Sequence, residues 1–325
     1  MRACIGTSYG SIESFSVVDI PLPRPRAGQL RIQIEATALG FVDGLMVRGK
    51  YQIQPPLPYT PGGEIVGIVD AVGPDVKGIG LGERVVTWQL GGGLAEYAVI
   101  DAQDVDSIEE DVAPQIAAAM LVDYQTSYYA LFERGRLTAA DSVLVIGAAG
   151  GVGAAAVQMA VQTGAHVIAA ASTEDKRRMA LELGACTAID YRKPDWRDAL
   201  RAAAPGGTID VVLDPVGGDT FEPAFRSLAK EGRYLVVGFA GGRIPALPAN
   251  LALLKSASLI GVDIRHFLGK QPERARRVRA SLFRQVKTGL LKPPVIVPFT
   301  LDQTREALEA TISRERRGKV VVMPG

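Results

Sequence analysis

Three glycines recur every third residue in the segment Gly147-Ala-Ala-Gly-Gly-Val-Gly153, and this spacing suits the binding of a pyrophosphate. A tight turn would let bare backbone approach the phosphates and would bring the next helix close to the preceding strand. The free amides at the N-terminus of that helix would hold the negative charge. An ordinary strand-to-helix turn is the alternative. The residues expected to contact such a ligand are Gly147, Gly150, Gly151, Val152 and Gly153.

The elements around these glycines are those of a nucleotide-binding unit. The four apolar residues from Val143 to Ile146 indicate a buried parallel strand, and the small residues of 153–163 indicate a helix. A second strand is predicted over 165–171. Because strand, glycine turn, helix and strand follow in the order of a βαβ unit, we expect a dinucleotide to bind here.

The end of the second strand indicates which dinucleotide binds. NAD-binding units place a carboxylate there for the ribose hydroxyls, whereas the 2′-phosphate of NADPH needs cations and hydroxyls. Ser172 and Lys176 follow this strand, and Tyr191 follows the third strand. Two charge-assisted bonds would favour NADPH over NADH by on the order of a hundredfold. Glu174 and Asp175 argue against this, but acidic residues at a helix start are also typical caps.

Length and charge restrict the architecture and the partners. At 325 residues the chain exceeds the ~250–300 residues at which single cores stop growing, so two domains are expected. A net charge of +1 gives no general attraction to nucleic acid, and the arginines of 274–284 are interpreted as a solvated helix face. We therefore expect no nucleic-acid partner.

Cysteine content and hydropathy indicate the compartment. Two cysteines, Cys4 and Cys186, are too few for a disulfide scaffold or a four-cysteine zinc lobe. No run of 18 apolar residues occurs, and the first ten residues lack the apolar core of a signal peptide. We therefore expect a cytoplasmic protein that does not enter a membrane.

Two regions of the chain differ in their pattern. Residues 1–115 contain short strand-like runs separated by Pro and Gly clusters, which indicates a largely antiparallel β domain. Residues 116–265 alternate strands and helices, as in a doubly wound parallel sheet of six strands. The tail, residues 266–325, breaks this rhythm and is predicted to return to the first domain. The six predicted parallel strands are 142–147, 165–171, 187–189, 209–213, 233–238 and 258–264.

Several longer motifs resemble the medium-chain dehydrogenase/reductase superfamily, and within it the zinc-free quinone oxidoreductases related to zeta-crystallin. The motifs are PLPYTPGGEIVGIVDAVG, LGERVV, GGLAEYAV, VLVIGAAGGVG, STEDK with IDY, DVVLDPVGG and GKVVVMP. The resemblance implies an α/β protein with two domains. A GroES-like β-barrel catalytic domain would comprise 1–115 and 266–325, with a Rossmann NADPH-binding domain, 116–265, inserted between them.

The resemblance also implies that no zinc is bound. Alcohol dehydrogenases of the superfamily hold a catalytic zinc with Cys, His and Cys side chains. Matching their motifs places Gly40, Gly63 and Val122 at these positions, and none of the three can coordinate a metal. Val42 stands at the position of the hydroxyl that relays an alcohol proton.

Further cofactor contacts are expected from the resemblance alone. Thr126 matches a position beside the nicotinamide, and Val216 lies in the DPVGG motif. The backbone of Phe239 and Ala240 is expected at the carboxamide, and Lys319 matches a basic residue that reaches the pyrophosphate.

Substrate-side residues depart from the family pattern. Many zinc-free relatives have an Asn and a Tyr where this chain has Gly40 and Leu45. The nearest polar residues are Asp43 and Tyr51, which we interpret as the candidate catalytic residues, with Tyr51 as proton donor.

These features predict a zinc-independent, NADPH-dependent reductase that transfers hydride to a quinone or an α,β-unsaturated carbonyl. Such an acceptor develops charge on an oxygen already stabilised by resonance, so no Lewis acid is needed. Two alternatives stay open: an enoyl-thioester reductase of the same superfamily, and an NADPH-binding protein without turnover.

The last predicted Rossmann strand, 258–264, is apolar and is expected at the sheet edge. Pairing with its two-fold copy would cover that edge and form a homodimer. Alternatively, the loop after Gly241 folds over the edge and leaves a monomer.

Overall fold

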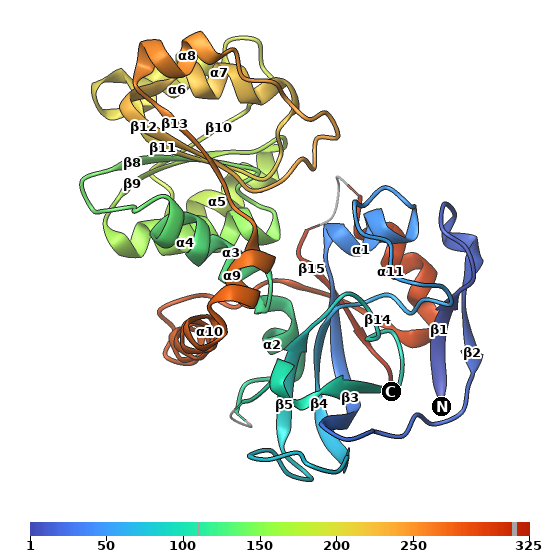
Figure 1. Ribbon diagram of the computed structural model, residues 1–325. Coiled ribbons are helices and arrows are strands. Elements are labelled where there is room, and N and C mark those ends of the chain that lie inside the picture. Colours follow the sequence, from blue (N-terminus) through green and yellow to red (C-terminus); the bar gives the residue numbers. More distant parts are fainter. Residues whose placement is uncertain (109–110, 314–316) are drawn as a thin grey trace. The chain divides into compact units, whose positions relative to one another are not determined.

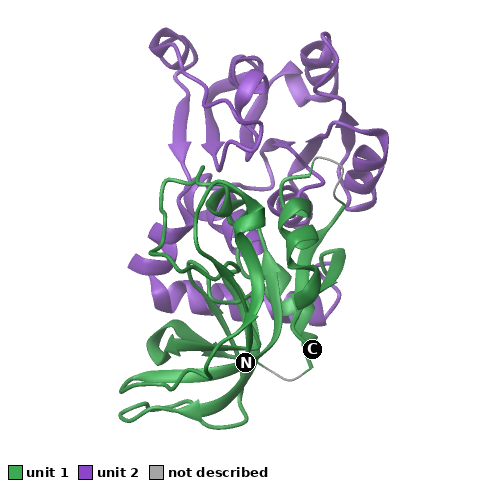
Figure 2. Cartoon of the chain, turned by 90° about the vertical axis from the view of Figure 1, so that its right-hand side faces the viewer, with its two compact units in different colours: residues 1–122, 293–325 green, residues 123–292 purple. Residues whose placement is uncertain are grey.

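The computed structural model describes residues 1–108, 111–313 and 317–325. The chain forms two compact units (Figure 2). The first comprises Met1–Val122 and Pro293–Gly325, and the second comprises Asp123–Lys292. Both ends of the chain therefore contribute to the first unit, and the second unit is inserted between them.

The first unit is built on β-sheets. Seven strands form one sheet, in which β14, β15, β3, β4, β5 and β7 are neighbours in that order and β6 also pairs with β3. A separate antiparallel pair is formed by β1 and β2. The strands are β1 (Arg2–Gly6), β2 (Phe15–Asp19), β3 (Gln29–Leu39), β4 (Glu64–Val72), β5 (Arg84–Trp88), β6 (Tyr97–Asp101), β7 (Val105–Ser107), β14 (Ile296–Thr300) and β15 (Lys319–Met323). The α-helices are α1 (Phe41–Val47), α2 (Pro114–Met120) and α11 (Thr304–Ala310), and three 3-10 turns are η1 (Ile12–Ser14), η2 (Ala102–Asp104) and η6 (Leu301–Gln303).

Strand β3 organises this unit because it pairs with β4, β6 and β15. Its side chains Leu30, Ile32 and Ile34 are buried, as alternation along a strand with one core-facing side requires. The pairing of β3 with β15 joins the two ends of the chain, which explains why the tail belongs to this unit.

The second unit is a parallel six-stranded sheet in the order β10, β9, β8, β11, β12, β13. Helices α4 and α5 lie on one face, and α6, α7 and α8 lie on the other (Figure 1). The doubly wound parallel sheet predicted from the sequence is confirmed. The strands are β8 (Ser142–Ile146), β9 (His166–Ala170), β10 (Thr187–Ile189), β11 (Ile209–Asp214), β12 (Leu228–Val236) and β13 (Ser258–Gly261). The helices are α3 (Asp123–Tyr128), a π-helical segment η3 (Tyr129–Arg134), α4 (Gly151–Thr163), α5 (Glu174–Glu182), α6 (Trp196–Ala203), α7 (Phe221–Arg226), α8 (Ala249–Lys255), α9 (Ile264–Lys270) and α10 (Pro272–Lys287), with 3-10 turns η4 (Pro205–Gly207) and η5 (Gly218–Thr220).

Segment 266–292 groups with the nucleotide unit, whereas we expected it in the first domain. The reason is packing that no local pattern reports. Phe267 of α9 stacks on Tyr129 with ring centroids 4.7 Å apart. Tyr124 donates from its hydroxyl to the carbonyl of Lys292 at 2.8 Å. These contacts hold α9, α10 and the following turn on α3.

The edge strand is shorter than the predicted 258–264. Strand β13 ends at Gly261, and the Asp263 side chain caps α9 by accepting from the amide of Arg265. The amide of Val262 donates to the carbonyl of Val236 in β12 at 2.9 Å. This amide is therefore already bonded within the sheet of its own chain. The position of β13 at the sheet edge agrees with the expectation.

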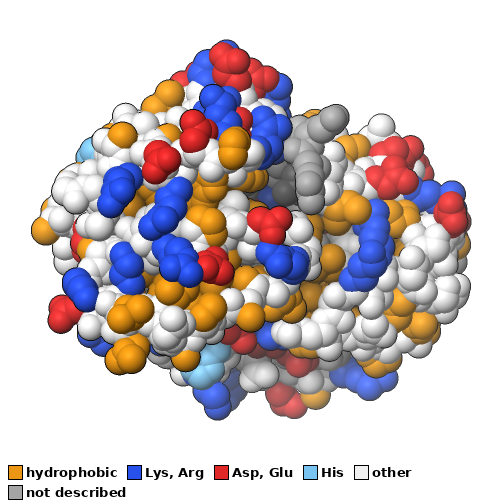
Figure 3. All heavy atoms as spheres, turned by 90° about the horizontal axis from the view of Figure 1, so that it is seen from above, with side chains coloured by type: hydrophobic (Ala, Val, Ile, Leu, Met, Phe, Trp, Pro, Cys, Tyr) orange, Lys and Arg blue, Asp and Glu red, His pale blue; other side chains and the backbone are white. Residues whose placement is uncertain are grey.

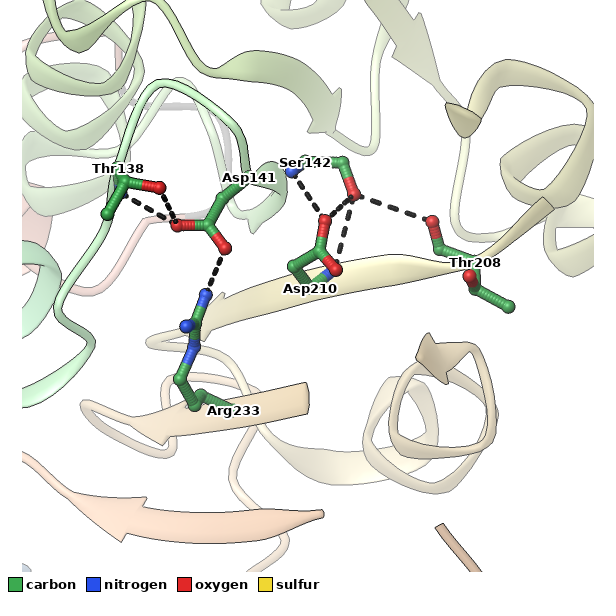
Figure 4. Close-up of polar contacts among 6 residues, drawn as sticks. All are labelled: Thr138, Asp141, Ser142, Thr208, Asp210 and Arg233. Carbon is green, nitrogen blue, oxygen red and sulfur yellow. Dashed lines mark hydrogen bonds and ion pairs between the residues drawn. The ribbon is translucent and has the colours of Figure 1, made fainter. Parts of the chain in front are cut away.

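A polar network joins the amino ends of three strands (Figure 4). Asp210 of β11 accepts from the amide and the hydroxyl of Ser142, at 2.8 and 2.7 Å. Asp141 pairs with Arg233 of β12 and accepts from the amide and hydroxyl of Thr138. These bonds link β8, β11 and β12 at the end of the sheet opposite the glycine turn.

Candidate functional site

The glycine turn predicted from the sequence connects β8 to α4. Gly147 has φ +66°, in the left-handed region that glycine adopts at no steric cost, and its carbonyl accepts from the amide of Gly150 at 2.9 Å. Gly150 is the N-cap of α4 and makes no side-chain capping bond. The first amides of a helix have no partner within the helix, so those of α4 suit an anionic ligand.

Neighbouring atoms fill the space that larger side chains would need in this turn. A Cβ at Gly153 would lie 2.2 Å from the carbonyl oxygen of Gly147, and a Cβ at Gly151 would lie 1.9 Å from Oδ2 of Asp123. Ser127 of α3 donates from its hydroxyl to the carbonyl of Val152 at 2.7 Å. Helix α3 therefore packs on the turn and fixes its shape.

Thr126 lies on α3, the helix that packs on this turn. Its side chain is buried, and its Oγ1 has no hydrogen-bond partner among the described residues. A buried hydroxyl without a partner costs free energy, so a bound polar group that pairs with it would be favoured. This agrees with the expected place of Thr126 beside a nicotinamide, which stays a prediction.

The residues predicted at the 2′-phosphate follow two neighbouring strands. Ser172 and Lys176 come after β9 and Tyr191 comes after β10, and these strands are parallel with Ile189 paired to Ala170. Thr173 caps α5 by accepting from the amide of Lys176 at 3.4 Å. The hydroxyls of Ser172 and Tyr191 and the cation of Lys176 therefore follow the carboxyl ends of two neighbouring strands.

The sequence reasoning missed Asp214, the last residue of β11. It is 2% exposed and accepts from the amides of Val216 and Gly217, at 2.7 and 2.9 Å, and from the hydroxyl of Tyr234 at 2.6 Å. Burial raises the pKa of both Asp214 and Tyr234. The signal available in the sequence was an acidic residue at the end of an apolar strand.

The bonds of Asp214 fix the loop that carries Val216. Cγ2 of Val216 lies 3.0 Å from the position that a Cβ of Gly147 would take, so Val216 packs against the glycine turn. Phe239 and Ala240 follow β12, where Ala240 donates its amide to Pro215 at 3.0 Å. All of these predicted residues belong to the second unit, and all but Thr126 follow the carboxyl end of a strand or lie in the first turn of the next helix; they are 126, 147, 150–153, 172, 176, 191, 216 and 239–240.

Lys319 lies in the first unit, in an ion pair with Glu64. Its Nζ is 2.7 Å from Oε1 of Glu64, and the two side chains are 3% and 4% exposed. Oε2 of Glu64 accepts from the amide of Val122 at 2.9 Å. The contact of Lys319 with a pyrophosphate stays a prediction. In the structure its charge neutralises the buried carboxylate of Glu64.

The positions that match zinc ligands surround this ion pair. A Cβ at Gly40 would lie 3.7 Å from Oε1 of Glu64 and 3.8 Å from Nζ of Lys319. At Gly63 a Cβ would lie 2.0 Å from the carbonyl oxygen of Gln89, so a histidine does not fit there without a backbone shift. No group of three or more His, Cys, Asp or Glu side chains suited to a metal occurs in residues 1–108, 111–313 and 317–325. The residues present therefore do not fit a zinc of the alcohol dehydrogenase type.

The candidate catalytic residues Asp43 and Tyr51 lie on and just after α1. Asp43 accepts from the amide of Gly40 at 2.7 Å and from that of Gly62 at 3.2 Å. Burial raises the pKa of Asp43, against the opposing effect of these amides and of Lys319. Tyr51 is partly buried beside the apolar cluster that contains Tyr59. Asp43 thus orders the backbone around Gly40 and Gly62, and the catalytic role of both residues stays a prediction.

Two family models match the chain. "Alcohol dehydrogenase GroES-like domain" matches residues 26–110, and "Zinc-binding dehydrogenase" matches residues 151–279. A relative from Rattus norvegicus, quinone oxidoreductase-like protein 2, is 34% identical over 302 residues, which cover 92% of this chain and 86% of the relative.

Solved structures are similar over the whole chain. The quinone oxidoreductase of Escherichia coli complexed with NADPH has a TM-score of 0.92 and 27% identity, covering 100% of both chains. The enoyl reductase CurK has a TM-score of 0.87 and 25% identity, covering 99% of both chains. The fold expected from the sequence, a GroES-like domain with a Rossmann domain, is confirmed.

Proposed function

Because the chain belongs to the quinone oxidoreductase family of the medium-chain dehydrogenase/reductase superfamily, we propose that it is a zinc-independent reductase of quinones or α,β-unsaturated carbonyls. It is an NADPH-dependent oxidoreductase. The observation that carries the proposal is the glycine turn, where neighbouring atoms leave no space for a Cβ at Gly151 or Gly153. The unpaired Oγ1 of Thr126, on the helix that packs on this turn, supports it.

When bound, NADPH supplies the hydride. The amides of Gly151, Val152 and Gly153 at the start of α4 hold the pyrophosphate. Ser172, Lys176 and Tyr191 recognise the 2′-phosphate. Thr126, Val216 and the backbone of Phe239 and Ala240 hold the nicotinamide end. Fixing the reactive ring in one orientation removes entropy from the barrier before the acceptor arrives.

The substrate side needs no metal in this proposal. A quinone or enone spreads the developing negative charge over a conjugated system, whereas an alkoxide needs a Lewis acid. Tyr51 is our proposed proton donor, and Asp43 holds the backbone near Gly40 and Gly62 in place.

Steady-state NADPH oxidation with a panel of quinones, enones and enoyl-thioesters tests the proposal. We expect turnover with quinones or enones that persists after treatment with a chelator. Turnover restricted to enoyl-thioesters would favour the alternative function, an enoyl-thioester reductase. The similarity to the enoyl reductase CurK is compatible with that alternative. Binding of NADPH without turnover of any acceptor would instead indicate a non-catalytic NADPH-binding protein.

The cofactor preference has its own test. Replacing Lys176 with Ala removes a cation from the proposed 2′-phosphate site, so we expect the Michaelis constant for NADPH to rise about tenfold or more. The constant for NADH should change little, because NADH lacks that phosphate. Equal effects on the two cofactors would reject the assignment of Lys176.

We also propose a homodimer formed through β13. This strand lies at the sheet edge with Leu259 45% exposed, and the preceding α8 exposes Leu253 and Leu254. Unpaired strand edges promote association, and pairing about a two-fold axis would cover both copies. The loop after Gly241, which could alternatively cover this edge, bonds at its start to the segment after β11, where the carbonyl of Arg243 accepts from the amide of Gly218 at 3.1 Å.

Replacing Leu259 with Asp tests the dimer. Two like charges would face each other near the two-fold axis, so light scattering should report a shift from dimer to monomer at micromolar concentration. Leu290, 65% exposed in the same unit, provides the control: Leu290→Asp should leave the mass unchanged. A wild-type protein that is monomeric would rule the dimer out.

The remaining partner and location proposals rest on charge, thiols and hydropathy. On the face shown in Figure 3, basic and acidic side chains are interspersed, which supports a small-molecule enzyme without a nucleic-acid partner. Cys4 and Cys186 are free thiols, which supports a cytoplasmic location. No helix in the described part of the chain is long and apolar enough to span a membrane.

A further inference from the structure

A carboxylate flanked by two arginines lies just after β10. Oδ2 of Asp190 is 3.0 Å from Nη1 of Arg177 on α5 and 3.1 Å from Nη2 of Arg192. Nε of Arg192 donates to Oδ1 of Asp190 at 3.2 Å, and the Arg192 amide donates to the same oxygen at 3.0 Å. Arg192 is therefore held by Asp190 through both its side chain and its backbone.

This cluster lies beside the proposed 2′-phosphate site. Strands β9 and β10 are parallel neighbours, and the amide of Ala171 donates to the carbonyl of Ile189 at 3.0 Å. Ser172 follows one strand end, and Asp190 to Arg192 follow the other. Arg177 also donates to the carbonyl of Ala171 at 3.2 Å, which ties the cluster to the end of β9.

Arg192 keeps donors for a second anion while Asp190 holds it. A guanidinium carries five N–H groups, and the bonds to Asp190 use only Nε and one hydrogen of Nη2. The Arg192 side chain is 58% exposed, whereas that of Asp190 is 10% exposed. The outward donors of Arg192 are thus accessible to a ligand in a fixed orientation.

The charge of the cluster favours a phosphate despite its acidic member. Within the cluster, two guanidinium groups and one carboxylate leave a net charge of +1. The hydrogen bond from Arg192 lowers the pKa of Asp190, so this carboxylate stays ionised and keeps its hold on both arginines. The acid therefore acts as an anchor for cations, unlike the ribose-binding carboxylate of NAD-specific units.

We propose that Arg192 contacts the 2′-phosphate of NADPH and determines cofactor specificity, and that Asp190 is a positioning residue that orients it. The inference rests on the proposed function, since it assigns further residues to the same cofactor site. A guanidinium held in advance loses less side-chain entropy on binding than an unanchored one does. Arg192 therefore adds to the recognition already expected from Ser172, Lys176 and Tyr191.

Binding of 2′,5′-ADP and 5′-AMP, measured by calorimetry, tests this without turnover. The two probes differ only in the 2′-phosphate, so the ratio of their dissociation constants isolates its recognition. Arg192→Ala should weaken 2′,5′-ADP by about tenfold to a hundredfold and leave 5′-AMP unchanged. Arg178→Ala, which removes a neighbouring arginine paired with Asp175, is the matched control and should alter neither.

Asp190→Asn tests the positioning role. Loss of the anchor should reduce the preference for 2′,5′-ADP, and Asp190→Glu should restore part of it. A preference that increases in Asp190→Asn would mean that Asp190 only subtracts charge, and would overturn its role. Unchanged 2′,5′-ADP binding in Arg192→Ala overturns the assignment of Arg192. If the wild type binds neither probe nor NADPH, the proposed function itself fails.

Discussion

Replacing Gly153 with Ala should weaken binding of NADPH and NADH alike, by on the order of a hundredfold if two charge-assisted bonds to the pyrophosphate are lost. The new Cβ would lie 2.2 Å from the carbonyl oxygen of Gly147 and 2.9 Å from Cα of Ala148. These are backbone atoms, so the start of α4 must move away from the turn. The amides that hold the phosphates would move with it.

Fluorescence titration of the two cofactors measures this effect, and Gly269→Ala is the control. Gly269 lies on α9, and a Cβ there would meet no atom within 4 Å. Alanine is a better helix former than glycine, so the control should bind normally and unfold no more readily. Affinities in Gly153→Ala close to those of the wild type would show that the glycine turn does not hold the pyrophosphate.

Replacing Lys319 with Met should destabilise the first unit by about 3–5 kcal/mol, because it leaves the buried Glu64 carboxylate without its ion-pair partner. Both side chains are almost fully buried, so water cannot compensate for the lost charge. Urea unfolding followed by tryptophan fluorescence and circular dichroism provides the measurement. The exposed pair of Arg226 and Glu222 is the control, and Arg226→Met should cost less than about 1 kcal/mol.

A second substitution separates the ion pair from the packing around it. Glu64→Gln in the Lys319→Met background removes the isolated charge while an amide oxygen can still accept from Val122. We expect this double variant to recover part of the lost stability, since replacing both members of a buried pair costs less than removing one. A single variant no weaker than the Arg226→Met control would contradict a structural role for Lys319.

The same variant examines the pyrophosphate contact predicted for Lys319. If Lys319 reaches the cofactor, Lys319→Met weakens the binding of NADPH and of NADH equally. This is measured without denaturant, at a temperature where the variant is folded. If its charge serves Glu64 alone, both affinities stay at the wild-type level while the unfolding free energy falls.

Local patterns in the sequence determined the nucleotide half of this protein. The apolar run 143–146, the glycines of the turn and the small residues of α4 interact with near neighbours, so their spacing alone predicts strand, turn and helix. The alternation of strands and helices then predicts a parallel sheet. Each crossover helix returns the chain to the end of the sheet where the previous strand began, so the next strand runs in the same direction. The motifs were specific enough to indicate the family as well.

Contacts between distant segments were decided only by the tertiary structure. Glu64 and Lys319 come from opposite ends of the chain and meet because β15 pairs with β3, next to β4. Segment 266–292 joins the nucleotide unit because Phe267 stacks on Tyr129. The ion pair between Asp190 and Arg177 depends on how α5 packs beside β10. Burial and ion pairing depend on which surfaces meet in three dimensions, and the spacing of residues along one segment carries no record of that.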